Sequence, residues 1–358
     1  MSNNFTKQDF YFMEQCLLLA KKGIGHVEPN PRVACLVVHQ AEIIASGYHS
    51  KFGAPHAEVE ALRNITDPSI LQACTLYVNL EPCSHHGKTP PCVDLILQNP
   101  PKRVVIAQSD PFDLVQGKGI EKLLAHGVQV DVGICEKDSH QLNAPFFTFH
   151  QEKRTYLRLK WAQTADGFMD KLRHANEKGA FGITGKTSQH WTHQQRASAQ
   201  AILVGKNTVL VDNPKLDARF FDEHKKIVRY VIDKNLEIPS HYQIYSDDLP
   251  TVIFNAHHAE KGLKSKVKLD FSNAKIVLDQ ISAYAYAEGV QSLWVEGGAF
   301  LLGECLAHDY WDEIHVLRAP QKIGQGLTAP AVPTSAQLHK KSPLGEDTLY
   351  TYVRENAL

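Results

Sequence analysis

The chain has 358 residues, of which 43% are hydrophobic and 22% are charged, and its formal net charge is −1. This length exceeds what one ordinary domain core holds, so about two domains are expected. A protein built to hold a polyanion usually has a basic excess, so nucleic acid is not expected as the main partner. No apolar run approaches the roughly 20 residues that a membrane helix needs, so no membrane partner is expected.

The first segment has apolar residues at helical spacing, which predicts an amphipathic helix from about Lys7 to Lys22. It lacks the basic opening of a secretion signal, and Asp9 and Glu14 interrupt it, so the protein is expected in the cytoplasm. The seven cysteines are Cys16, Cys35, Cys74, Cys83, Cys92, Cys135 and Cys305. An odd, scattered set in a reducing compartment argues against a disulfide framework.

Strands and helices alternate along the first part of the chain. The expected elements are a hairpin over 33–49, a helix over 56–63, a strand over 74–82, a helix over 91–99, a strand over 103–110, a helix over 119–127 and a strand over 128–134. This alternation predicts a three-layer α/β sheet. We expect it to form a first domain over residues 1–147.

The second part, residues 148–358, is of the same class without repeating the sequence. Strands are expected over 155–163, 201–205, 227–233, 251–256, 275–279, 292–296 and 312–320, and helices over 186–200 and 299–307. The two parts together predict two α/β domains of unequal kind.

Residues 81–92 read EPCSHHGKTPPC, and an upstream segment, APHAEVEA, spans 54–61. One histidine and two cysteines make three zinc ligands, and a catalytic zinc keeps its fourth position open. The H-x-E and P-C elements are typical of zinc deaminases, in which the glutamate is not a ligand. We therefore expect His56, Cys83 and Cys92 to bind Zn²⁺ and Glu58 to carry protons.

Both halves of this pattern are expected at helix starts. His56 and Cys92 each follow a proline, so two helix N-termini would meet at one metal. Zinc would activate a water molecule, and Glu58 would pass its proton to the ring nitrogen and the departing amine. Two alternatives stay open. One is a closed structural zinc completed by His85 or His86, and the other is unconnected core cysteines beside a surface histidine.

Longer stretches resemble the bacterial bifunctional riboflavin-biosynthesis deaminase–reductases. The resemblance rests on VEPNPRVACLVV, GYHSKFGAPHAE and LEPCSHHGKTPPC, and later on LKWAQTADG, ILVGKNTVLVDNPKLDAR and WVEGGAFLLG. It covers nearly the whole chain. It implies a cytidine-deaminase-like three-layer α/β/α domain followed by a dihydrofolate-reductase-like α/β domain. It also implies a homo-oligomer, which the family usually forms through the reductase half.

The resemblance implies a substrate, 2,5-diamino-6-(ribosylamino)-4(3H)-pyrimidinone 5′-phosphate. The first domain would replace its 2-amino group by oxygen, and the second would reduce the ribose, in its open imine form, to ribityl with NADPH. In the first domain Asn30 would contact the pyrimidine, His49 and His85 would surround the substrate, and Lys88 would suit the phosphate. Without the resemblance, each would be interpreted as a turn or loop residue.

In the second domain, Gly297-Gly298 offers backbone N–H groups to a phosphate at a helix start, although it is not a G-x-G-x-x-G fingerprint. From the residues alone, such a pair is more often just a tight turn. By resemblance, the substrate would be held by Arg196, Leu216, Arg219 and Glu296. The cofactor would lie against Ala162, Thr208, Asp212, Gly297 and Gly298.

One segment departs from the family pattern. Before Ile183-Thr184 the family typically has a Gly-x-Ser-x-Trp run, whose Ser and Trp contact substrate and nicotinamide. This chain has Gly179-Ala180-Phe181-Gly182 there. We therefore expect different local contacts, although the other reductase residues are kept.

Two other functions remain as alternatives. A zinc deaminase of tRNA or nucleosides with a non-catalytic second domain would share the ligands, but it predicts a basic face and usually P-C-x-x-C. A non-enzymatic protein with a closed structural zinc would bind metal without turnover on any pyrimidine.

Overall fold

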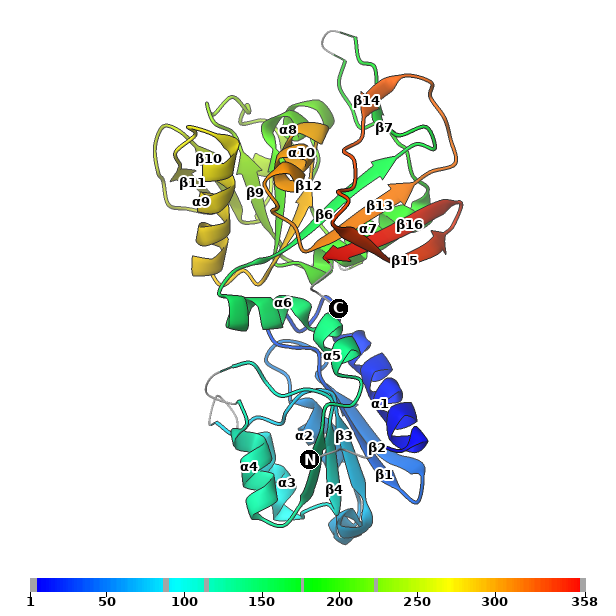
Figure 1. Cartoon of the computed structure of the whole chain (residues 1–358). Helices are drawn as coiled ribbons and strands as arrows, with labels where there is room; N and C mark the ends of the chain where they lie inside the picture. The colour runs from blue at the N-terminus through cyan, green and yellow to red at the C-terminus, as the bar shows by residue number, and fades with distance from the viewer. Residues whose placement is uncertain (1–4, 86–89, 113–115, 175–176, 222–224, 355–358) are drawn as a thin grey trace. The chain divides into compact units, whose positions relative to one another are not determined.

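The computed structural model describes residues 5–85, 90–112, 116–174, 177–221 and 225–354. The chain divides into two compact units, Met1–Lys153 and Arg154–Leu358, each built on its own large sheet (Figure 1). The expected division at 147/148 lies between α6 (Ala144–Phe147) and the π-helix η3 (Thr148–Glu152), which both belong to the first unit. None of the described helices is long and apolar enough to cross a membrane.

The first unit contains a five-stranded sheet. In sheet order its strands are β2 (Glu42–Tyr48), β1 (Ala34–His39), β3 (Thr75–Val78), β4 (Arg103–Ile106) and β5 (Gln129–Val132). The hairpin β1–β2 is antiparallel, as the sequence predicts, and β3, β4 and β5 are parallel to one another. The parallel strands therefore end at the same edge of the sheet, and β3 leads directly into Glu81 and Cys83.

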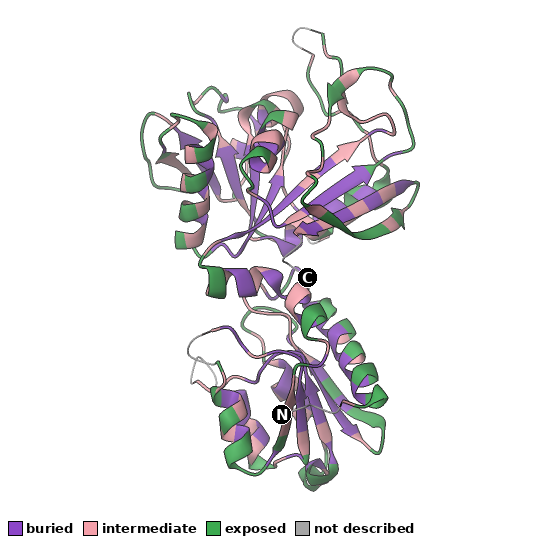
Figure 2. Cartoon of the chain, viewed as in Figure 1, coloured by how far each residue is buried: buried purple, intermediate pink, exposed green. Residues whose placement is uncertain are grey.

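Helices cover both faces of this sheet, which confirms the three-layer prediction. One face packs against α2 (Ala57–Leu62), α3 (Cys92–Gln98) and α4 (Lys118–Ala125). The other packs against α1 (Lys7–Ala20) and α5 (Glu136–Leu142). The short 3-10 helices are η1 (Lys21–Gly23) and η2 (Pro68–Ala73). The central strands β1, β3 and β4 are largely buried, whereas the edge strands β2 and β5 and the helices also have exposed or half-buried positions (Figure 2).

A glycine allows α2 to lie directly on β2. A Cβ atom on Gly47 would be only 2.4 Å from the backbone nitrogen of Ala61 and 2.5 Å from the carbonyl oxygen of Ala57. Real Cβ atoms do not approach backbone atoms so closely, so only glycine fits at this position. The contact fixes the helix that begins beside His56 and Glu58.

The second unit contains a nine-stranded, mostly parallel sheet. Its order is β11 (Lys264–Lys268), β10 (Thr251–Asn255), β9 (Val228–Ile232), β8 (Ala201–Gly205), β12 (Ser292–Glu296), β6 (Tyr156–Gln163), β13 (Glu313–Arg318), β16 (Asp347–Arg354) and β15 (Ala336–Leu344). The antiparallel strands β15 and β16 form one edge. A separate two-stranded sheet pairs β7 (Phe168–Lys171) with β14 (Gly326–Thr328).

Helices again lie on both faces. One core joins the sheet to α9 (Ala274–Ala287) and α10 (Ala299–Ala307). The opposite core joins it to α7 (Lys186–Ser198), α8 (Lys206–Asp212) and the neighbourhood of the 3-10 helix η4 (Gln243–Tyr245). This confirms the predicted second α/β domain.

One predicted strand is wrong. Residues 275–279, KIVLD, lie inside α9 rather than in the sheet. Asn273 caps the helix by accepting the N–H of Ile276 at 2.9 Å. The buried residues continue at helical spacing beyond the short apolar run, at Val277, Leu278, Ile281 and Ala285. A five-residue window does not distinguish a strand from a buried helix segment, whereas the longer period does.

Candidate functional site

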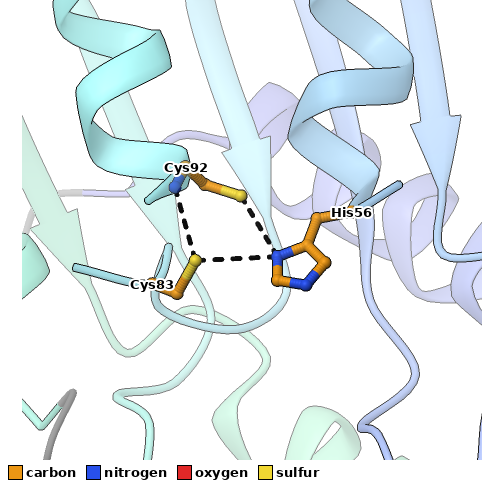
Figure 3. A group of neighbouring side chains, drawn as sticks. All are labelled: His56, Cys83 and Cys92. Carbon is orange, nitrogen blue, oxygen red and sulfur yellow. Dashed lines mark hydrogen bonds between the residues drawn. The ribbon is translucent and has the colours of Figure 1, made fainter. Parts of the chain in front are cut away.

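Three zinc-ligand side chains of the first unit meet at one point (Figure 3). Nδ1 of His56 lies 3.3 Å from Sγ of Cys92 and 3.6 Å from Sγ of Cys83. All three ligand atoms are within 4.8 Å of one another. Within the described ranges, no other set of His, Cys, Asp or Glu side chains forms such a group. The structure therefore brings together the three predicted ligands.

The ligands are positioned by two helix starts and one strand end, as the sequence predicts. His56 is the N-cap of α2, and Cys92 is the first residue of α3. The Sγ of Cys83 accepts the N–H of Cys92 at 3.3 Å, and its carbonyl oxygen accepts the N–H of Val93 at 3.2 Å. The first turn of α3 thus holds Cys83 at both its side chain and its backbone.

The electrostatics of this group favour a bound cation. The hydrogen bond from the Cys92 side chain lowers the pKa of Cys83 to about 4, despite burial. The same contact raises the pKa of Cys92 far above its usual range. The hydrogen bond to Cys83 also raises the pKa of His56. Both sulfurs bind a metal as thiolates, so a metal ion here would displace the thiol proton that remains on the pair. One nitrogen and two sulfurs fit Zn²⁺ with an open fourth position.

Glu58 lies in the first turn of α2, beside the ligand group. Its side chain is only 3% exposed. Burial raises its pKa, and the charge of Cys83 raises it further. A hydrogen bond to Cys92 connects the carboxyl group to the ligands. A buried carboxyl in this position can take up and release a proton during a reaction at the metal.

Asn30 and His49 lie in the same region and are bonded to each other. Nδ2 of Asn30 is 3.0 Å from Nε2 of His49, and Nδ1 of His49 is 3.0 Å from the carbonyl oxygen of Pro55. Nδ1 therefore donates to the carbonyl and Nε2 accepts from the amide, which fixes one neutral tautomer. Burial lowers the pKa of His49, which agrees with a neutral ring. His49 thus ties Asn30 to the residue before His56.

His85 lies outside the ligand group. Its Nδ1 is buried without a hydrogen-bond partner among the described residues, and its ring centroid lies 6.0 Å from that of Phe112. The structure therefore gives no support to a closed site with His85 as fourth ligand. His86 and Lys88, which the sequence analysis also named, lie outside the described residues.

A carboxylate that the sequence analysis missed holds the loop of Cys83. Glu81 is 3% exposed and accepts four backbone N–H groups. The donors are Gly119 (3.0 Å) and Ile120 (3.3 Å) to Oε1, and Gly117 (3.0 Å) and Asp110 (3.2 Å) to Oε2. Three of them belong to the start of α4, where negative charge is favoured. A Cβ on Gly119 would lie 2.4 Å from the carbonyl oxygen of Pro82, so the helix start touches the chain beside Cys83.

We expect Glu81→Gln to lower deaminase activity and zinc retention by about 10- to 100-fold, as loss of outer-shell support for a metal ligand does. The amide keeps the size but places an NH₂ group against backbone N–H donors, so two acceptor positions are lost. The measurement is the rate of zinc loss to a chelator, with deaminase and reductase rates on the same preparation. Glu121→Gln, on the exposed side of α4, is the control. Wild-type zinc retention in Glu81→Gln would contradict the prediction.

The second unit contains a cavity of about 900 Å³ at the carboxyl ends of β6, β8 and β12. Ligands of open α/β sheets bind outside these strand ends, and the volume suits a small-molecule site. The cavity is lined by all nine residues predicted for the reductase site, namely Ala162, Arg196, Thr208, Asp212, Leu216, Arg219, Glu296, Gly297 and Gly298. The structure therefore assembles residues that lie far apart in the sequence.

A half-buried ion pair forms part of the wall of this cavity. Arg196 donates to both carboxylate oxygens of Glu296, from Nε at 2.8 Å and from a terminal nitrogen at 2.7 Å. Nε1 of Trp294 donates to the same carboxylate at 2.6 Å. Burial opposes ionisation of Glu296, but the charges of Arg196 and Lys160 outweigh it and hold its pKa at about 2. The carboxylate is therefore fixed and ionised.

Another part of the wall joins α8 to the Gly-Gly turn. Oγ1 of Thr208 accepts the N–H of Gly298, the N-cap of α10, at 3.2 Å. Burial raises the pKa of Asp212, which lies 3.9 Å from Arg173. Ala180, Phe181 and Gly182 of the segment that departs from the family pattern also line the cavity, as do the Ile183 and Thr184 that follow it. The cavity thus has a helix N-terminus, where an anionic group is favoured, beside polar side chains from three elements.

Comparisons with known proteins cover both units. The family model "RibD C-terminal domain" matches residues 155–350, and the model "Cytidine and deoxycytidylate deaminase zinc-binding region" matches residues 6–108. The riboflavin biosynthesis protein RibD of Aquifex aeolicus is 39% identical over 97% of this chain and 98% of its own length. That of Escherichia coli is 33% identical over 88% of this chain and 89% of its own length.

Solved structures agree over nearly the full length. The diaminohydroxyphosphoribosylaminopyrimidine deaminase/5-amino-6-(5-phosphoribosylamino)uracil reductase of Thermotoga maritima matches with a TM-score of 0.85 and 32% identity. The match covers 97% of this chain and 99% of that one. RibD of Acinetobacter baumannii matches with a TM-score of 0.83 and 29% identity, over 97% and 99% of the two chains. The chain therefore belongs to the RibD family of bifunctional riboflavin-biosynthesis enzymes, in which a zinc-dependent deaminase precedes an NADPH-dependent reductase.

Proposed function

We propose that this chain catalyses two consecutive steps on one phosphorylated pyrimidine. The first unit replaces the 2-amino group of 2,5-diamino-6-(ribosylamino)-4(3H)-pyrimidinone 5′-phosphate by oxygen and releases ammonia. The second unit reduces the ribosyl chain to ribityl. The observation that carries the proposal is the convergence of His56, Cys83 and Cys92 beside a buried Glu58. Family membership and the cavity of the second unit support the reductive step.

In the first unit, His56, Cys83 and Cys92 would hold Zn²⁺, which when bound activates water for attack on the ring. Glu58 would receive a proton from the attacking water and deliver it to the ring nitrogen and then to the leaving amine. Its burial supports this role, since few waters can compete for the proton. Asn30 would contact the pyrimidine, and His49 and His85 would surround the substrate, with His49 also bonded to Asn30. Lys88 remains a prediction for the phosphate.

In the second unit, NADPH when bound supplies the hydride that reduces the sugar carbon. Gly297 and Gly298 would hold its phosphates at the start of α10, with Ala162, Thr208 and Asp212 beside them. Arg196, Leu216, Arg219 and Glu296 would hold the phosphorylated sugar. The ion pair of Arg196 with Glu296 supports this assignment because it keeps both polar groups rigid at the cavity wall.

Mass spectrometry of the pyrimidine after incubation tests both steps. We expect exchange of the amine for oxygen with and without NADPH, and addition of two hydrogens only with NADPH. Removal of zinc by a chelator should stop the exchange, while reduction of the already deaminated compound continues. Exchange without reduction would show that the second unit has another task. If neither occurs in zinc-replete protein, deamination of tRNA or free nucleosides becomes the function to test. The cytoplasmic location and the homo-oligomer stay predictions.

A further inference from the structure

A histidine that the sequence analysis did not name also lines the cavity of the second unit. His193 lies on α7, one turn before Arg196, and its side chain is about 6% exposed. Its ring packs against that of Phe220, with centroids 4.5 Å apart. Arg196 and Arg219, both predicted to hold the phosphorylated sugar, line the same cavity. His193 is therefore held in place at the sugar end of the proposed site.

One ring nitrogen of His193 has no hydrogen bond. Nδ1 is buried and has no partner in the described part of the chain, and the carboxylate oxygen Oδ1 of Asp217 lies 3.9 Å away. Asp217 is itself paired with Arg219. Because the protein itself encloses Nδ1, Nε2 is the only ring nitrogen that can contact a ligand in the cavity that His193 lines.

The charges around the ring define its protonation state. Four charged groups face it: Arg196 from α7, Asp217 and Arg219 from the loop after α8, and Glu296 from the end of β12. Burial and the two arginines lower the pKa of His193 to about 4, so the ring is neutral near pH 7. A neutral imidazole carries one proton. That proton is favoured on Nδ1, which faces the carboxylate of Asp217, because the other tautomer points a lone pair at a negative charge.

We propose that His193 is a substrate-binding residue of the reductase site, whose Nε2 accepts a hydrogen bond from a hydroxyl group of the substrate's sugar chain. This inference rests on the proposed function. A bare acceptor cannot bond phosphate or carbonyl oxygens, which carry no hydrogen. A sugar hydroxyl does carry one, and the neighbouring Arg219 and Leu216 are the residues assigned to the phosphorylated sugar. The arginines thus select the phosphate, and His193 selects the polyol chain.

Two substitutions test the acceptor role. We expect His193→Leu to lower reductase kcat/KM for the deaminated pyrimidine by about 10- to 100-fold, the range for one lost substrate hydrogen bond. His193→Gln, whose amide oxygen is an acceptor, should stay within about fivefold of wild type. The Kd of NADPH, measured by fluorescence, and the deaminase rate should not change in either variant. Gln194→Leu, at an exposed position of the same helix that does not line the cavity, is the control and should behave as wild type.

Other outcomes overturn the inference. Wild-type kcat/KM in His193→Leu would show that the ring makes no useful contact with substrate. Equal losses in the Leu and Gln variants would exclude a simple acceptor, and weaker NADPH binding would place the contact on the cofactor. Calorimetric binding of the ribityl product to wild type and His193→Leu gives a readout without turnover. If the wild-type protein neither binds nor reduces the pyrimidine, the proposed function itself has failed. That outcome is seen in wild type alone and so is distinct from any result with the His193 variants.

Discussion

Glu58→Gln is expected to stop deamination while zinc stays bound and reduction continues. Glutamine keeps the size of the side chain and can still hydrogen bond, but it cannot carry a proton. Loss of a general acid–base group costs about 10²- to 10⁴-fold in rate. Glu58 is not one of the three gathered ligands, so the metal content should remain that of wild type. The measurements are the deamination rate, zinc per chain, and reduction of the pre-deaminated compound.

Glu60→Gln is the matched control, because it changes the same residue type on the same helix. Glu60 is half-buried, and its carboxylate pairs with Arg63 at the surface. Such exposed pairs contribute about 0–1 kcal/mol, so this variant should keep its activity and its metal. If Glu58→Gln still deaminates at more than about a tenth of the wild-type rate, another group moves the proton. If zinc is lost together with activity, Glu58 supports the metal group instead.

Arg196→Met is expected to destabilise the second unit and abolish reduction. It leaves the half-buried carboxylate of Glu296 with Lys160 as the remaining nearby cation, and leaving a partly buried charge without its partner costs about 1–3 kcal/mol. The free energy of unfolding of the second unit, measured by denaturant titration, should fall by that amount. Reductase activity should fall with it, since the fixed guanidinium at the cavity wall is gone. The deaminase rate should remain close to wild type.

The double variant Arg196→Met/Glu296→Met separates the two effects. Removing both charges together leaves no unpaired carboxylate, so much of the lost stability should return. Reduction should not return, because both proposed substrate contacts are missing. Recovery of activity in the double variant would contradict the assignment of this pair to the substrate. Lys275→Met breaks the exposed pair with Asp279 and should change stability by at most about 0.5 kcal/mol, which makes it the control.

The zinc site was predictable because its ligands are defined by residue type and by local signals. His56 and Cys92 each follow a proline at a helix start, and Cys83 follows a strand, so the sequence predicts where each lies in its element. The reductase residues were not predictable from such signals. Arg196, Thr208 and Glu296 belong to three different elements, and only the resemblance named them before the sheet order placed their elements side by side.

The supporting residues escaped the sequence analysis for a different reason. Glu81 and His193 look like ordinary polar residues, because their roles depend on partners distant in the chain. The role of Glu81 becomes apparent only in the folded chain, where the start of α4 packs against the loop of Cys83. The role of His193 becomes apparent only there too, because Asp217 and Arg219 come near its ring from a distant segment. The edge strand β15 was also missed, since its exposed lysines and Pro343 resemble a loop in composition.

The sequence by itself indicated the two α/β domains, a candidate set of zinc ligands beside a proposed proton carrier, and the membership in one enzyme family. The domains and the candidate ligands follow from periodicity and motif spacing, which are local properties of the chain, whereas the family was implied by the resemblance of longer stretches. Only the tertiary structure decided that 275–279 is helical, that nine dispersed residues line one cavity, and which buried groups support the sites. The physical reason is that burial, strand order and charge neighbours arise when distant segments pack, and no local pattern records them.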